Sequence, residues 1–185
     1  MATAFQPAHL DDAWRAARSY QAYFCEENVW QLLRNAELPA PAAAIFVTNA
    51  RRAVAIWGQR AAVTDPIVWD YHVVAYVPRE RIIVDLDDRE RVAWPLADWL
   101  AHAFRKDTPA SLQPRFRIVA AEQFLTTFSS DRSHMRDASG VPLRAFPPWA
   151  APLQPNRGMN LPRFLDLADS IAGVVTDRAA LISLG

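Results

Sequence analysis

The chain contains a single cysteine, Cys25, and that thiol has the widest choice of chemistry of any side chain in the sequence. Without a second cysteine it cannot form an internal disulfide. It is therefore a core side chain, a metal ligand, a redox-active thiol or a nucleophile. A nucleophilic cysteine needs a general base close to it and a group that orients the base, so the question is which histidine and which carboxylate the fold can bring to Cys25.

Two predicted strands carry a histidine and several carboxylates. An alternating run over 67–77 contains His72, a turn follows at Pro78-Arg79-Glu80, and the chain returns over 81–86. Side chains two residues apart on a strand point to the same face. The alternation therefore also places Asp70 on the face of His72.

The register of this strand pair brings Asp85 and Asp87 close to His72. With Val77 paired to Ile82, the histidine faces Asp87. The other aspartate is then on the diagonal, and a bulge would bring it directly opposite instead. In either register the Cβ atoms lie roughly 4.5–8 Å from that of the histidine. The pattern predicts a histidine–aspartate pair and leaves the choice of aspartate open.

The apolar spacing after the cysteine predicts a helix that begins near it. Apolar residues over 29–36 recur at i, i+3, i+4 and i+7, and Cys25 lies on the same face one turn earlier. Free N–H groups and the dipole at a helix N-terminus favour a thiolate and can form an oxyanion hole. Glu26 and Glu27 act against the thiolate, because negative charge raises a thiol pKa. They point to other sides of the helix, so their effect need not outweigh that of the dipole and His72.

The remaining segments predict an α+β fold, a mainly antiparallel sheet flanked by helices. Further helices are predicted over 11–18, 95–105 and 121–128, and further strands over 44–48, 53–57 and 116–119. A polar loop follows at 129–134, and the stretch 144–160 is rich in proline and irregular. Asn160 is placed to cap a last main helix that starts at Leu161.

Composition narrows the class of protein. The length of 185 residues, with 51% hydrophobic and 22% charged residues, is typical of one globular domain over 1–185. The 20 basic and 20 acidic residues cancel, which disfavours binding to nucleic acid or to an anionic membrane. No signal peptide or membrane-spanning run is predicted, and a lone cysteine suits a reducing compartment. We therefore expect a cytoplasmic monomer.

Four strings of residues, in this order, are more specific than any single spacing. They are Cys25-Glu26-Glu27-Asn28-Val29-Trp30, Trp69-Asp70-Tyr71-His72-Val73, Asp85-Leu86-Asp87 and Ser130-Asp131-Arg132-Ser133-His134-Met135. Together with Met159-Asn160-Leu161, these strings resemble the protein N-terminal glutamine amidohydrolases, the family named for its WDYHV motif. The resemblance covers most of the chain and is weakest before Tyr20, over 101–114 and after Leu165.

The resemblance implies a scaffold like that of papain-like proteases and transglutaminases, with a Cys–His–Asp triad. Carried over by position, the triad is Cys25, His72 and Asp85, which selects the first of the two aspartates. The implied reaction deamidates an N-terminal glutamine of a peptide or protein to glutamate. It proceeds through a thioester and releases ammonia, and it needs no metal or other cofactor.

Such an enzyme must accept a free α-amino group, for which a carboxylate beside the cleft is a natural partner. The candidate carboxylates are Glu26, Glu27, Asp70 and Asp131. Further candidate substrate-binding residues are Asn28, Trp69 and Ser129. Two alternatives stay open. The same triad could support peptide cleavage or acyl transfer to an amine, and the chain could also be a module that binds peptide N-termini without turnover.

Overall fold

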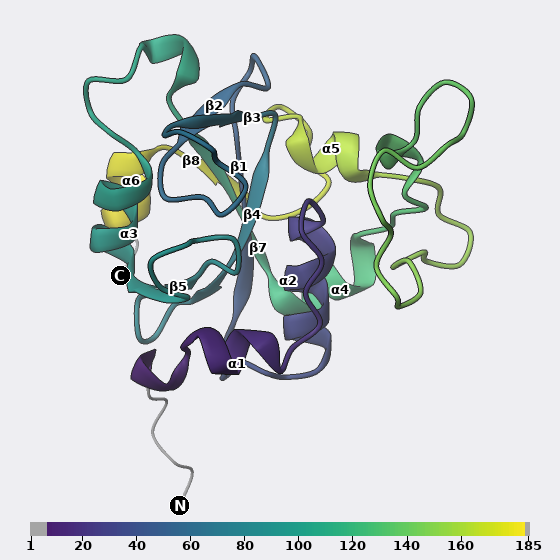
Figure 1. Cartoon of the computed structure of the whole chain (residues 1–185), viewed down its shortest axis with the longest axis horizontal. Helices are drawn as coiled ribbons and strands as arrows, with labels where there is room; N and C mark the ends of the chain where they lie inside the picture. The colour runs from purple at the N-terminus through teal and green to yellow at the C-terminus, as the bar shows by residue number, and fades with distance from the viewer. Residues whose placement is uncertain (1–6, 184–185) are drawn as a thin grey trace, which may run out of the picture.

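A central six-stranded sheet organises the computed structural model, which describes residues 7–183 (Figure 1). Its strand order is β6-β5-β4-β1-β7-β8, and every neighbouring pair is antiparallel. The strands are β1 (Ala43–Thr48), β4 (His72–Val77), β5 (Ile82–Val84), β6 (Ala93–Pro95), β7 (Arg115–Ala120) and β8 (Val174–Thr176). A separate two-stranded sheet pairs β2 (Val54–Ile56) with β3 (Ile67–Trp69).

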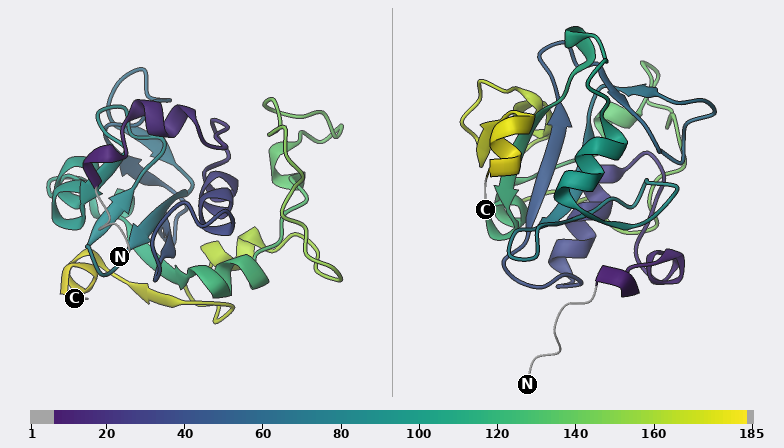
Figure 2. Two further views of the ribbon diagram at one scale, coloured as in Figure 1. Left: turned by 90° about the horizontal axis from the view of Figure 1, so that it is seen from below. Right: turned by 90° about the vertical axis from the view of Figure 1, so that its left-hand side faces the viewer.

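Helices cover both faces of the six-stranded sheet (Figures 1 and 2). One face packs against α2 (Cys25–Arg34), α4 (Ala121–Thr127) and α5 (Leu161–Leu165). The other face packs against α3 (Leu96–Ala103) and α6 (Arg178–Ser183). The remaining helical segments are α1 (Asp12–Ala16) and the 3₁₀ turns η1 (Pro7–His9), η2 (Ala110–Leu112) and η3 (Ser133–Met135). The predicted α+β architecture with a mainly antiparallel sheet is confirmed.

Strand β1 lies inside the sheet and is buried along its whole length. Phe46 faces α4 and α5, where its ring contacts Phe124 and Phe164 with centroids 5.5 and 5.1 Å away. Ile45 and Val47 point to the opposite face and pack toward α3. Burial on both faces explains why this strand is a continuous apolar run rather than an alternating one.

The predicted strand over 67–77 is two strands that belong to different sheets. The chain bends at Asp70 and Tyr71, so that β3 pairs with β2 while β4 enters the main sheet. The hydroxyl of Thr48 donates to the carbonyl of Asp70 at 2.8 Å and holds this bend. Asp70 therefore lies outside β4, and strand alternation does not relate its side chain to that of His72, although both line one cavity. Alternation cannot be carried across a break in the strand.

Several helix predictions are confirmed, with shorter bounds. The Asp11 side chain caps α1 by accepting the Trp14 N–H at 2.8 Å, and α2 begins at Cys25 as the apolar spacing predicts. The sequence did not predict β6, β8 or α6, each of which has six residues or fewer. No helix within residues 7–183 has both the length and the apolar character that crossing a bilayer requires.

Asn160 precedes α5, as predicted, but its side chain does not cap that helix. Its Oδ1 accepts the N–H of Ser129 at 2.8 Å, and its Nδ2 donates to the carbonyl of Thr127 at 2.7 Å. These two bonds join the start and the end of residues 129–160, which we call the outer loop. The outer loop runs beyond α2 and α4, away from the sheet (Figure 2).

Candidate active site

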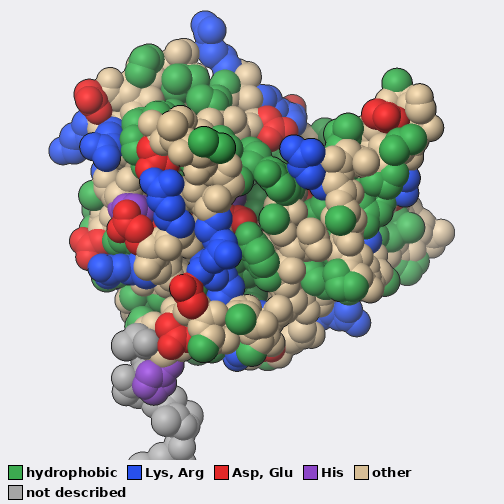
Figure 3. All heavy atoms as spheres, in the orientation of Figure 1, with side chains coloured by type: hydrophobic (Ala, Val, Ile, Leu, Met, Phe, Trp, Pro, Cys, Tyr) green, Lys and Arg blue, Asp and Glu red, His purple; other side chains and the backbone are tan. Residues whose placement is uncertain are grey.

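Cys25 is the first residue of α2 and lines a cavity of about 480 Å³. Trp69, Tyr71 and His72 line the same cavity, and Met135 contributes from the outer loop. Figure 3 shows the molecule in the orientation of Figure 1, with a hollow near the middle of the visible surface. Hydrophobic and acidic side chains lie inside the hollow, and basic side chains lie beside it. The N–H groups in the first turn of a helix have no partner within the helix, so the thiol lies next to free backbone donors.

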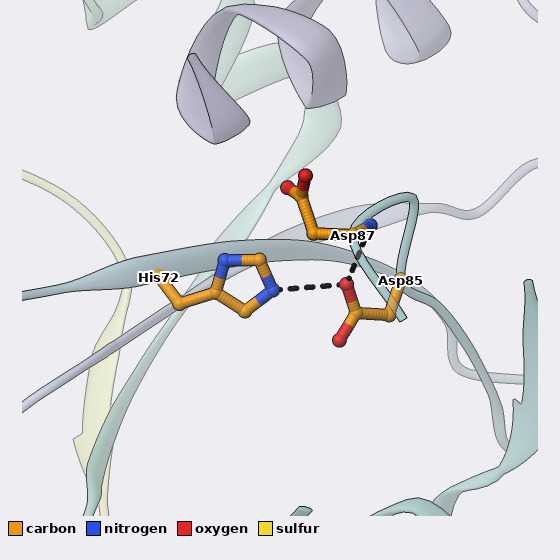
Figure 4. A group of neighbouring side chains, drawn as sticks. All are labelled: His72, Asp85 and Asp87. Carbon is orange, nitrogen blue, oxygen red and sulfur yellow. Dashed lines mark hydrogen bonds and ion pairs between the residues drawn. The ribbon is translucent and has the colours of Figure 1, made fainter. Parts of the chain in front are cut away.

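The buried imidazole of His72 contacts the buried carboxylate of Asp85 (Figure 4). Nε2 of the histidine lies 2.9 Å from Oδ1 of the aspartate. An ionised carboxylate can only accept, so Nε2 carries the proton and Nδ1 keeps a free lone pair. Figure 4 shows Nδ1 pointing away from Asp85. This is the tautomer that a general base acting through Nδ1 requires.

The turn after β5, rather than the strand register, brings Asp85 to the histidine. Val77 pairs with Ile82, the register from which the sequence predicts Asp87 opposite His72. The pairing with β4 ends at Val84, however, because the chain then turns. Residues beyond the last pair no longer follow the strand geometry, and the first residue of the turn reaches the imidazole.

Three further groups hold the Asp85 carboxylate in place. Oδ1 accepts the N–H of Asp87 at 3.0 Å, and Oδ2 accepts from Trp99 Nε1 at 3.2 Å and from Gln59 Nε2 at 3.3 Å. Burial alone would raise the pKa of Asp85, but the charge of His72 and these hydrogen bonds hold that pKa below its ordinary value. These contacts favour an ionised carboxylate beside the imidazole.

Arg15 of α1 is a positioning residue that sequence reasoning missed. Its side chain is buried, and its Nη1 donates to the carbonyls of Leu86 at 3.2 Å and Asp88 at 2.7 Å. These bonds fix the turn over 85–88 that carries Asp85. An arginine on a short helix has no local signal that would indicate such a contact, because the partners lie more than seventy residues away in sequence.

The surroundings of Cys25 favour the neutral thiol. Burial raises the pKa of Cys25, the carboxylates of Glu26 and Asp87 raise it further, and the backbone N–H of Val73 acts in the opposite direction. The sequence left open whether the helix N-terminus and His72 outweigh the two glutamates, and the balance here favours the thiol. Burial is the largest cause, and helical spacing does not show how deep a residue lies.

His72 has the opposite environment. Burial disfavours its charged imidazolium, but the carboxylates of Asp85, Asp87 and Asp88 together outweigh burial, and the pKa of His72 is raised. A histidine in this environment accepts a proton readily and holds it well. The pair can therefore take a proton from a thiol that does not ionise by itself.

Glu26 and Glu27, which follow Cys25, are both fully buried, which excludes a solvated helix face. Glu27 makes a two-point ion pair with Arg132, with Nε and Nη2 at 2.8 and 2.7 Å, and accepts from Trp149 Nε1 at 3.0 Å. Its carboxylate therefore joins α2 to the outer loop. Glu26 instead contacts Tyr71, at 3.0 Å, and His134, at 3.3 Å.

The other candidate substrate-binding residues divide into two groups. Trp69 and Asp70 line the cavity. Asn28, Ser129 and Asp131 do not line it, and each is used in local structure. The side-chain amide of Asn28 accepts the N–H of Gln21 and donates to the carbonyl of the same residue, at 2.9 Å each. The Ser129 hydroxyl donates to a carbonyl of the outer loop at 3.2 Å, and the exposed Asp131 accepts the N–H two residues later at 2.8 Å.

His72, Asp85 and Asp87 each offer one possible ligand atom to a metal ion, and these atoms lie within 4.8 Å of one another. Hydrogen bonds inside the protein already use this set. The histidine nitrogen donates to Asp85, and Asp87 accepts the hydroxyl of Tyr20 at 2.7 Å. Because the donors and acceptors satisfy one another, we assign no ion to the cluster.

Comparison with known proteins shows the family. A family model described as N-terminal glutamine amidase matches residues 20–184. The chain belongs to this family. Proteins named protein N-terminal glutamine amidohydrolase from Homo sapiens and Bos taurus are 34% and 37% identical to it. The human alignment covers 88% of this chain and 83% of the relative, and the bovine one covers 74% and 70%. A protein of the same name from Caenorhabditis elegans is 29% identical over 89% of this chain and 94% of its own length.

The N-terminal glutamine amidase family is thus the one that the motif strings predict, and its name describes an enzyme that acts on an amide C–N bond. The structure brings the strings of this family member to one place. Cys25, the segment 69–72 and His134 line one cavity, and Asp85 lies directly behind its histidine. Segments separated by more than one hundred residues therefore form a single site.

Proposed function

We propose that this protein hydrolyses the side-chain amide of N-terminal glutamine in peptides and proteins, using Cys25, His72 and Asp85. One observation carries the proposal: a buried histidine, 2.9 Å from a buried aspartate, lines the same cavity as the chain's single thiol in a member of this family. The products are ammonia and an N-terminal glutamate. The papain- and transglutaminase-like character of the scaffold belongs to the same proposal.

In the first half of the reaction, Sγ of Cys25 attacks the carboxamide carbon while Nδ1 of His72 takes the thiol proton. Proton transfer accompanies the attack, because burial and two carboxylates disfavour a free thiolate. The oxyanion accepts the backbone N–H of Cys25 at the N-terminus of α2. The imidazolium, stabilised by Asp85, then protonates the departing ammonia, and a thioester remains on the cysteine.

In the second half, water replaces ammonia. His72 takes a proton from the water as its oxygen attacks the thioester carbon. The C–S bond breaks, the proton returns to the sulfur, and the side chain leaves as a carboxylic acid. No electron changes hands, and one water is consumed for each ammonia released.

Recognition of the free α-amino group falls to Asp70 in this proposal. Of the four carboxylates that the sequence analysis names as candidates for this contact, Asp70 alone lines the cavity. Glu27 is paired with an arginine, Glu26 lies behind the cavity wall, and Asp131 lies outside it. An ammonium beside Asp70 would make a charge-assisted contact that an internal glutamine cannot make. Trp69 supplies an apolar wall next to it.

An ammonia-release assay tests the function. Peptides beginning with Gln, Asn, acetyl-Gln and Gly-Gln are compared, and we expect rapid release only from the first. Cys25→Ala and His72→Ala should each abolish release and leave the circular dichroism spectrum unchanged. Mass spectrometry separates the alternatives, because deamidation adds about one dalton while acyl transfer joins two molecules. Equal activity on the acetylated peptide, or stable binding without turnover by the reduced enzyme, would refute the proposal.

A further inference from the structure

The carboxylate of Glu26 is a fully buried charge that the proposed mechanism does not use. Its Oε2 accepts from the hydroxyl of Tyr71 at 3.0 Å and from Sγ of Cys25 at 3.6 Å. Its Oε1 makes no hydrogen bond of good geometry, and Nε2 of His134 lies 3.3 Å from it. Burying a carboxylate is costly unless its charge is compensated. His134 is therefore the side chain placed to compensate the charge of Glu26.

His134 reaches Glu26 from the outer loop, where it belongs to η3. Its side chain is 20% exposed and lines the active-site cavity. The same ring nitrogen lies 3.5 Å from the Tyr71 hydroxyl. Glu26 is thus enclosed by the nucleophile, a tyrosine and a histidine that meets solvent on the substrate side.

The other charged groups around this cluster are few within residues 7–183. On α2, Glu27 is compensated by Arg132. On the outer loop, the exposed Asp131 interacts electrostatically with His134. From the turn after β5, Asp87 acts on Cys25. Among the described residues, His134 is therefore the basic side chain in direct contact with the Glu26 carboxylate.

We propose that Glu26 and His134 form a second acid–base pair that controls when Cys25 loses its proton. Glu26 accepts the hydrogen bond of the resting thiol and repels the thiolate. His134, whose Nε2 lies 3.3 Å from the free oxygen of Glu26, offsets the charge of that carboxylate when protonated and so weakens this restraint. Glu26 acts directly on the thiol of Cys25, and His134 is a positioning residue that acts through Glu26. The inference rests on the proposed function only for the identity of the nucleophile.

A thiol that stays protonated between turnovers is less reactive toward oxidants and electrophiles. The thiolate is the form that oxidants and electrophiles attack, and a cavity open to substrate is open to them as well. Cys25 that stays protonated until its proton is drawn to His72 is protected between turnovers. The negative charge of Glu26 also opposes proton loss from Cys25 in the first chemical step. By offsetting that charge, His134 lowers this barrier.

The rate of alkylation by iodoacetamide, measured as a function of pH on the full chain, tests the inference. The signal reports Cys25 alone, because the chain has one cysteine. Glu26→Gln should move the midpoint to lower pH and raise the rate near neutral pH roughly three- to tenfold, since a lower pKa gives more thiolate of somewhat lower nucleophilicity. His134→Ala should slow alkylation when Glu26 is present and have no effect in the Glu26→Gln background.

Glu27→Gln is the matched control. It makes the same isosteric change at the next residue, where Arg132 already compensates the charge, and should leave the midpoint in place in protein that is still folded. If Glu26→Gln does not fold, Glu26→Asp retracts the carboxylate from the thiol and should move the midpoint in the same direction. An unchanged midpoint, or equal effects of His134→Ala in both backgrounds, would overturn the inference. Alkylation needs no turnover, so failure of ammonia release would refute the proposed function without affecting this result.

Discussion

The proton on the His72 imidazole faces Asp85, and this placement distinguishes the two neighbouring aspartates. Asp85 is fully buried and accepts hydrogen bonds on both oxygens, so it has a fixed orientation. Asp87 lines the cavity and accepts the Tyr20 hydroxyl. Its pKa is raised, mainly by burial. In the proposed mechanism, the first aspartate orients the base, while the second contributes to the electrostatics of the cavity.

Asp85→Asn should therefore lower kcat by about 10³- to 10⁴-fold, because an amide can donate to Nε2 and so stabilise the wrong tautomer. Asp87→Asn should lower kcat less than about tenfold, since it removes one carboxylate and leaves the histidine pair intact. Ammonia release at saturating peptide measures both. A larger loss from the Asp87 variant would contradict the assignment.

The pH profile of kcat/KM should follow the proton on His72. The base must be neutral in the free enzyme, and its pKa is raised by Asp85. Activity should thus fall with decreasing pH through an apparent pKa above about 6.5, the ordinary value for histidine. Removing the carboxylate charge in Asp85→Asn favours the neutral imidazole, so this acidic limb should move to lower pH. Initial rates between about pH 5 and about pH 9 test it, and a wild-type limb at or below the ordinary value would contradict it.

At the scale of the elements, the outer loop contributes His134 and Met135 to the cavity although it lies outside the sheet layers. The buried pair of Glu27 and Arg132 ties it to α2. Arg132 also donates to the carbonyls of Pro147 and Trp149, at 3.3 and 2.8 Å. One guanidinium group therefore links α2 to two distant parts of the loop.

Arg132→Met should lower the free energy of unfolding by about 3–5 kcal/mol, because it leaves the Glu27 carboxylate buried without a partner. Urea denaturation measures the change. The double variant Glu27→Leu/Arg132→Met should regain much of the loss, since no uncompensated charge remains. Arg136→Met, an exposed arginine of the same loop, is the control and should change stability by less than about 0.5 kcal/mol. Equal effects of Arg132→Met and Arg136→Met would contradict the structural role of the ion pair.

At the scale of the whole molecule, a buried arginine of β7 ties the C-terminal segment to the sheet. Arg117 donates to four backbone carbonyls, those of Phe164, Asp166, Asp169 and Ala172, at 2.5–2.9 Å. These carbonyls belong to the end of α5 and the irregular stretch before β8. One side chain of the central sheet thus supplies the hydrogen-bond donors for four backbone carbonyls of a largely irregular segment.

Arg117→Met should lower the free energy of unfolding by about 3–5 kcal/mol, because buried carbonyls lose their donor. Arg115→Met is the matched control on the same strand. Its guanidinium makes a single described bond, to the Thr176 carbonyl, and the residue is exposed. Calorimetry should show one cooperative transition for each, as the single-domain prediction requires. Separate transitions for the C-terminal segment would contradict that prediction.

The sequence by itself determined the features that depend on neighbours along the chain. The helix that begins at Cys25, the strand of His72 and the turn after Val77 follow from local periodicity. The motif strings predicted the family, because they preserve the residues themselves. Local patterns also predicted a histidine–aspartate pair, although they could not select the aspartate.

Only the tertiary structure decided how those residues are used. Asp85 contacts His72 because the chain leaves the strand at Val84, and a buried arginine of α1 holds that turn. The pKa of Cys25 is raised because the fold buries the thiol and places the Glu26 carboxylate beside it. Such outcomes depend on burial and on partners distant in sequence, 105 residues apart for Glu27 and Arg132. Electrostatic energies depend on the local dielectric and on distance in space, and neither quantity can be read from the order of residues.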